Sequence, residues 1–91
     1  MIKVVKITPI EGHLLALVFS DGTRGTLDCA SILGSEGPMI VPLREASYFS
    51  KVFLDNGAPT WPNGFDMAPW AVHKDLKDKG LLTTAGANAA E

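Results

Sequence analysis

Residues 61–66 (WPNGFD) place the most chemically versatile side chains of this sequence in one short segment. Trp61 offers a large flat surface, Asn63 a side-chain amide, and Asp66 a carboxylate where a helix is expected to begin. Gly64 has no Cβ and would allow another molecule to approach the backbone closely. Because binding residues are often carried by loops on a rigid scaffold, this turn is the best candidate site for a ligand or partner.

The same turn also has a purely structural interpretation. Trp61 and Phe65 would fill the core, Asn63 and Gly64 would make the turn, and Asp66 would cap the following helix. For a binding role, exposed aromatic side chains are the residues that most often anchor an interface. The contact residues expected on that basis are Trp61, Asn63, Phe65, Asp66 and Trp70.

No acid pair is apparent that could perform general acid–base catalysis. Asp21, Asp28, Asp55 and Asp66 all occupy positions where turns and helix caps favour aspartate, because its side chain accepts local backbone N–H groups. A catalytic pair would have to converge with separated pKa values, and nothing in this spacing indicates convergence. We therefore expect no catalytic residues among them.

Metal binding and nucleophilic catalysis also lack their usual sequence patterns. Structural zinc sites use pairs of ligands that lie close together in the sequence. The candidate ligands here are His13, Cys29 and His73, and the nearest two, His13 and Cys29, are sixteen residues apart. Asp28 precedes Cys29 and would raise the pKa of its thiol, which disfavours a reactive thiolate. Phosphate-binding glycine loops are absent. The expectation is a protein without metal or cofactor that is not an enzyme.

Composition and charge indicate one globular domain with protein rather than nucleic-acid partners. The chain has 91 residues, 46% of them hydrophobic and 20% charged, and a net charge of -2. This charge argues against direct binding of nucleic acid. Lys3, Lys6, Arg24 and Arg44 could cluster on the outer face of a sheet, more plausibly as a solvated face than as a phosphate-binding stripe.

Several features point to a cytoplasmic protein that does not enter the membrane. Cys29 is the single cysteine, so no intramolecular disulfide can form. Residues 1–6 lack the apolar stretch of a signal peptide. The longest apolar run, residues 14–19, has six residues, far fewer than the roughly 20 that span a bilayer.

Hydrophobic periodicity and turn residues predict an α+β fold. It comprises a small antiparallel β-meander, a second short hairpin around Asn56-Gly57, and two or three short helices. Residues 1–82 form this single domain, and 83–91 are expected to be a disordered tail. The expected strands cover 3–7, 13–19, 24–27, 52–55 and 58–61; the expected helices cover 28–33, 45–51 and a segment starting near Pro69 and closing at Gly80.

The second strand is apolar on both faces. Leu15, Leu17 and Phe19 point to one side, and residues 14, 16 and 18 to the other. An antiparallel strand with a solvated face should alternate apolar and polar residues. The strand is therefore either covered on both faces by the rest of the chain, or one face is an interface with a second copy.

The order of four segments resembles a bacterial family called domain of unknown function 2442. The segments are 21–28 (DGTRGTLD), 37–45 (GPMIVPLRE), 48–57 (YFSKVFLDNG) and 61–69 (WPNGFDMAP), and the resemblance covers roughly residues 3–70. Its most characteristic pieces are Asp21-Gly22, Pro42-Leu43, Phe49 and Trp61-Pro62-Asn63-Gly64-x-Asp66. The resemblance implies a small α+β domain, with stand-alone members working beside a second small protein in the manner of toxin–antitoxin pairs. It supplies no catalytic residues.

These observations lead to a small module that acts by binding. Its expected partner is a small protein or a second copy of the chain. The alternative, which the resemblance to a family with members fused to helix-turn-helix modules favours, is a regulator that meets nucleic acid only within an assembly. A small-molecule enzyme using the turn at Asp66 is the least favoured hypothesis.

Overall fold

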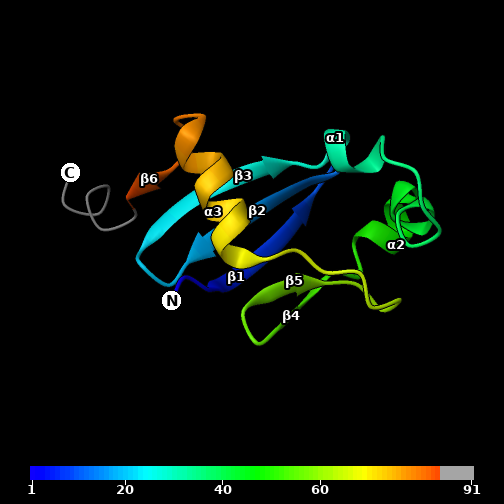
Figure 1. The fold of residues 1–91 in the computed structure, drawn as a ribbon, viewed down its shortest axis with the longest axis horizontal. Coiled ribbons are helices and arrows are strands. Elements are labelled where there is room, and N and C mark those ends of the chain that lie inside the picture. Colours follow the sequence, from blue (N-terminus) through cyan, green and yellow to red (C-terminus); the bar gives the residue numbers. More distant parts are fainter. Residues whose placement is uncertain (85–91) are drawn as a thin grey trace.

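The α+β architecture expected from the sequence is confirmed in the computed structural model, which describes residues 1–84 (Figure 1). Strands β1, β2, β3 and β6 form one antiparallel sheet in that order, and β4 and β5 form a separate hairpin. Three short α-helices and one 3₁₀ helix, η1, complete the described part of the chain. The elements are β1 (Val4–Ile10), β2 (Leu14–Phe19), β3 (Thr23–Asp28), α1 (Ala30–Leu33), η1 (Val41–Arg44), α2 (Ala46–Phe49), β4 (Phe53–Asp55), β5 (Ala58–Thr60), α3 (Pro69–Asp78) and β6 (Thr83–Thr84).

The register of the meander separates an inner from an outer face. Leu17 lies between Ile7 of β1 and Gly25 of β3, and its side chain is 1% exposed. Ala16 lies in the next row of the sheet, between Thr8 and Thr26, so its side chain points to the opposite face. The core therefore lies on the side of the sheet that Leu17 faces.

Helix α3 crosses the inner face of the sheet and closes the core (Figure 1). Val72 and Leu76 are its buried residues. Trp70, at the start of the same helix, is 63% exposed and lies outside the core. The most completely buried large side chains are Trp61, Phe19, Leu15, Leu17, Leu43 and Leu76.

The Asn56-Gly57 turn of the second hairpin is confirmed. Both residues have positive φ, +55° and +84°, as a two-residue turn of type I′ requires. The hairpin is attached to the meander through the N–H of Val4, which donates to the carbonyl oxygen of Gly57 at 2.9 Å. The second hairpin thus covers the beginning of β1.

Strand β1 continues further than the sequence predicts, to Ile10 rather than Ile7. Pro9 is compatible with this because its nitrogen faces the free edge of the strand and not β2. The helix predicted at 45–51 is shorter and covers Ala46–Phe49. Residues 39–43 are apolar but contain Pro42, which predicts an edge strand or an extended passage. In the structure they instead enter η1, where Pro42 occupies the first turn, a position in which its missing N–H is tolerated.

Two other expectations concern the outer face of β2 and the end of the chain. The outer residues Leu14, Ala16 and Val18 are half-buried. Thr83 and Thr84, expected in the tail, pair with Arg24 and Thr23 as β6. The rest of the predicted tail, 85–91, lies outside the described residues.

Candidate functional site

The turn at residues 61–66 is built around a buried tryptophan. Trp61 is 1% exposed, and its indole Nε1–H donates to the carbonyl oxygen of Phe49 at 2.9 Å. Its ring centre lies 5.6 Å from that of Phe49 and 5.8 Å from that of Phe65. Because the indole has both its apolar packing and its hydrogen-bond partner inside the protein, it presents no surface to a partner in this conformation.

Asn63 holds the turn in place. Its side-chain amide donates to the carbonyl oxygen of Met39 at 3.0 Å and accepts the N–H of Phe65 at 3.1 Å. Gly64 adopts a φ of +92°, and its N–H donates to the carbonyl oxygen of Trp61. The Asn63 side chain and the Gly64 N–H are thus occupied by contacts within the protein, as the structural interpretation of these two residues predicts.

Asp66 and Trp70 are the two expected contact residues that the structure leaves at the surface. The predicted capping role of Asp66 is wrong: α3 has Ala68 at its N-cap and no side-chain cap bond. Pro69 begins the helix, so one N–H that would need a cap is missing there. A contact role for the Asp66 and Trp70 side chains stays a prediction.

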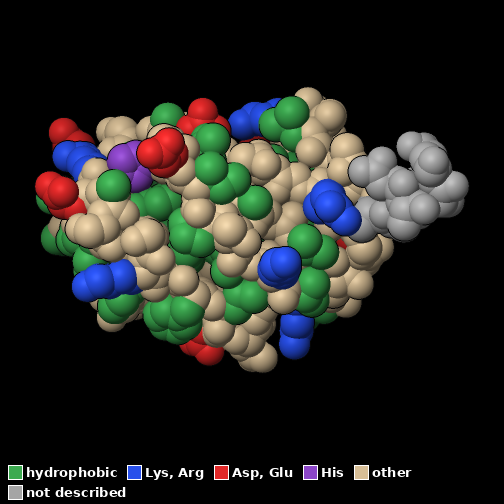
Figure 2. All heavy atoms as spheres, turned by 180° about the vertical axis from the view of Figure 1, so that it is seen from behind, with side chains coloured by type: hydrophobic (Ala, Val, Ile, Leu, Met, Phe, Trp, Pro, Cys, Tyr) green, Lys and Arg blue, Asp and Glu red, His purple; other side chains and the backbone are tan. Residues whose placement is uncertain are grey.

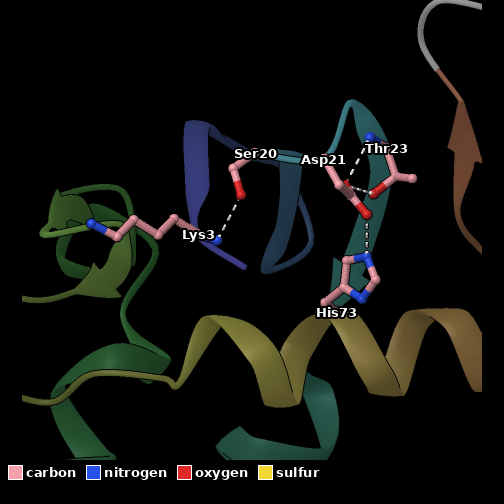
Figure 3. A network of polar contacts seen from close by, with 5 residues as sticks. All are labelled: Lys3, Ser20, Asp21, Thr23 and His73. Atoms are coloured by element: carbon pink, nitrogen blue, oxygen red, sulfur yellow. Dashed lines mark hydrogen bonds and ion pairs between the residues drawn. The ribbon is translucent and has the colours of Figure 1, made fainter. Parts of the chain in front are cut away.

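A polar network joins α3 to the turn between β2 and β3 (Figure 3). The Nε2 atom of His73 lies 2.9 Å from Oδ2 of Asp21, and the His73 ring packs edge-on against Phe19. The hydroxyl of Thr23 donates to Oδ1 of Asp21 at 2.6 Å, and the Thr23 N–H donates to the same atom. The hydroxyl bond is the main reason that the pKa of Asp21 lies below its ordinary value, and His73 lowers it further.

Replacing Asp21 by alanine is expected to lower the free energy of unfolding by about 1 kcal/mol at neutral pH, since several hydrogen bonds to a partly exposed carboxylate are lost. A depressed native pKa stabilises the fold above the unfolded value of 3.8, and this contribution disappears as pH falls through the native value. Urea unfolding at pH 7 and at pH 2.5 measures the difference. Glu36→Ala, in an exposed loop, is the control; an equal loss at both pH values would contradict the assignment.

Cys29 is a packing residue rather than a nucleophile. Its side chain is buried, and burial, assisted by the charge of Asp28, raises the pKa of the thiol to about 12. Asp28 itself accepts the N–H of Ala30 at 2.9 Å, which begins α1 close to the predicted position. Within residues 1–84, no cluster of histidine, cysteine or acidic side chains has the arrangement to hold a metal ion.

An apolar groove, here called the α3 groove, lies between β3, α1 and α3. Its volume is about 320 Å³. Asp75 supplies the single charged side chain of its lining, where it also pairs with Lys79 at 3.2 Å as the i,i+4 spacing predicts. The lining residues are Leu27, Ile32, Met67, Ala68, Ala71, Val72 and Asp75.

The α3 groove was not identified from the sequence. Ala68 and Ala71 are small residues on one side of α3, and their size leaves the space open. The two alanines can be read from the sequence, but they indicate a groove only because the fold places Leu27 and Ile32 opposite them. Of the surfaces described here, the groove has the shape and apolar character best suited to receive another molecule.

The outer face of the meander has a different character (Figure 2). Lys6, Val18 and Arg24 form one row across the sheet, and basic side chains stand among hydrophobic ones on this side. Beside them, a shallow hollow of about 210 Å³ lies over Ala16. The predicted basic cluster is only partly assembled, because the guanidinium of Arg44 donates to the carbonyl oxygens of two residues in and after α1, Leu33 and Ser35.

None of the helices in the described residues combines the length and the apolar character needed to cross a membrane. Comparison with known families finds that the model described as "Protein of unknown function (DUF2442)" matches residues 4–74. Searches of curated proteins and of solved structures find no significant match.

Proposed function

Because the chain belongs to the DUF2442 family, whose description leaves the activity open, we propose from its structure that it acts by binding a second protein. The α3 groove carries this proposal. Its lining includes three side chains of the core, Leu27, Met67 and Val72, which are 6%, 8% and 7% exposed. An apolar concavity of this kind receives an apolar side chain of a partner, which gains stability by leaving water.

The chemistry of the described residues favours binding over catalysis. The two titratable groups with the most developed environments, Asp21 and Cys29, are engaged in a structural network and buried in the core, respectively. Neither lines the α3 groove. We therefore propose that this protein is cytoplasmic and forms one half of a two-protein pair of the toxin–antitoxin kind, with the α3 groove as the point of contact.

Capture of tagged protein from native lysate, with and without nuclease, tests the proposal. We expect a stoichiometric small protein that survives nuclease and is lost when Ala71→Arg fills the groove. Ala46→Arg makes the same change at an exposed position of α2 and should leave capture intact. The proposal is wrong if the captured protein is retained by Ala71→Arg while the variant remains folded, or if no protein is captured.

The row containing Lys6 and Arg24 supports a second candidate, a regulator that meets nucleic acid within an assembly. Two cations on one sheet face can contact phosphates even when the net charge is negative. The same capture experiment separates the candidates. Loss of the captured material on nuclease treatment and in Lys6→Glu/Arg24→Glu, with retention in Ala71→Arg, would favour this alternative.

A further inference from the structure

The two edges of the main sheet differ in how far other parts of the chain cover them. On the β1 edge, the second hairpin covers Val4, and Pro9 has no N–H to offer to another strand. On the opposite edge, β6 pairs with Thr23 and Arg24 of β3, and Leu81 and Leu82, which precede β6, lie close to Gly25. On this edge, the remaining part of β3, up to Asp28, pairs with no other strand within residues 1–84.

The hydrogen-bond phase of β3 shows which backbone groups face this open edge. The N–H of Cys29 donates to the carbonyl oxygen of His13 and therefore points toward β2. Since the direction alternates along an antiparallel strand, the N–H and C=O groups of Thr26 and Asp28 point the other way, to the open edge. By the same alternation, the N–H and C=O groups of Arg24 face β6, in which Thr83 lies opposite.

The open edge and the α3 groove are parts of one surface. Leu27, between the two outward-facing residues, lines the groove on the inner side of the sheet. A strand added beside Thr26 and Asp28 would therefore direct alternate side chains into the groove. Its other side chains would lie on the outer face, next to the exposed carboxylate of Asp28.

We propose that the partner of the α3 groove is an extended segment that adds to β3 as a further antiparallel strand, with an apolar residue opposite Leu27 and a basic residue opposite Asp28. The apolar residue fills the groove, whose rim carries Asp75, and the basic residue meets the carboxylate at the edge. Backbone hydrogen bonds to Thr26 and Asp28 supply affinity, and the alternating side chains supply specificity. This inference rests on the proposed function, because both use the same groove.

A capped peptide of sequence Thr-Val-Lys-Val-Thr, with lysine placed opposite Asp28, is the probe. Titrated into ¹⁵N-labelled protein, it should shift the amide signals of Thr26, Asp28 and the α3 groove. Methylation of the lysine amide nitrogen removes one backbone donor and leaves its side chain in place. The dissociation constant should rise about fivefold, which corresponds to one net hydrogen bond of about 1 kcal/mol.

Two protein variants provide matched controls. Thr26→Pro removes the outward N–H without touching the ladder to β2, and we expect it to weaken the probe by a similar factor. Asp28→Asn keeps an acceptor for the N–H of Ala30 but removes the charge, so it should weaken the lysine peptide and not a peptide with threonine at that position. Dispersed amide spectra of both variants confirm that they are folded.

The strand-addition proposal is overturned if the probe does not bind, if its shifts fall elsewhere, or if N-methylation and Thr26→Pro leave its affinity unchanged. These outcomes are separate from a failure of the proposed function. Loss of the cellular partner in Ala71→Arg, together with its retention in Thr26→Pro, would preserve the groove as a protein-binding site and reject strand addition. Retention of the partner in both variants would reject the groove itself.

Discussion

Replacing Trp61 by alanine is expected to lower the free energy of unfolding by about 3–5 kcal/mol. The indole is 1% exposed and packs against Phe49 and Phe65, so truncation leaves a large cavity in the core. It also leaves the carbonyl oxygen of Phe49 without the indole donor that now lies 2.9 Å away. In a domain of this size, such a loss is comparable with the entire stability.

Equilibrium unfolding in urea, followed by far-ultraviolet circular dichroism, measures this loss. Trp70→Ala is the matched control, because the same residue type is removed from a site that is 63% exposed, and a change within about 0.5 kcal/mol is expected. Trp61→Phe retains apolar volume and should fold if alanine does not. Similar losses for the two alanine variants would contradict the assignment of Trp61 to the core.

Gly57→Ala is expected to destabilise the protein more than Gly12→Ala, although both glycines have a φ of +84°. A Cβ added at Gly57 would lie 2.6 Å from Cβ of Lys3, whereas one added at Gly12 would have no atom within 4 Å. The shared left-handed backbone costs about 1–2 kcal/mol in both variants. The excess at Gly57 reports the close packing of the second hairpin on the start of β1. A Cβ atom does not move when its side chain rotates, so the overlap with Lys3 Cβ is relieved by a shift of one of the two backbones.

Thermal and urea unfolding of the two glycine variants, measured side by side, give this difference. We expect Gly57→Ala to lose at least 1 kcal/mol more than Gly12→Ala, of the order found for overpacked sites. Amide signals of Lys3 and Val4 should also shift in Gly57→Ala, because the N–H of Val4 donates to the carbonyl oxygen of this glycine. Equal losses would show that the hairpin is not packed against β1 as described.

Local sequence was sufficient to predict most of the elements. A short apolar run between turn residues predicts β2 to within one residue, and Asn56-Gly57 predicts the second hairpin because only residues that tolerate positive φ can form that turn. Boundaries were less well predicted where proline was involved. Pro9 lies inside β1, since a proline whose nitrogen faces an edge removes no ladder bond.

The candidate site was predicted less well than the fold. Residues 61–66 do form one compact turn, but the sequence does not tell which of its aromatic side chains point inward. Two tryptophans nine positions apart have opposite environments: one is 1% exposed and the other 63%. Their local sequences do not decide this, because burial depends on what the rest of the chain places above each ring, such as Phe49 over Trp61.

Membership of the family is shown by a match over residues 4–74. The sequence by itself also determined the α+β class, the consecutive order of β1, β2 and β3, and the two-sided apolar character of β2. These properties follow from periodicity and turn chemistry, in which each residue acts on near neighbours. Only the tertiary structure decided the contact of His73 with Asp21, the α3 groove and the open edge of β3. Each depends on segments that are distant in sequence: the open edge, for example, exists because the pairing of β6 with β3 does not extend beyond Arg24.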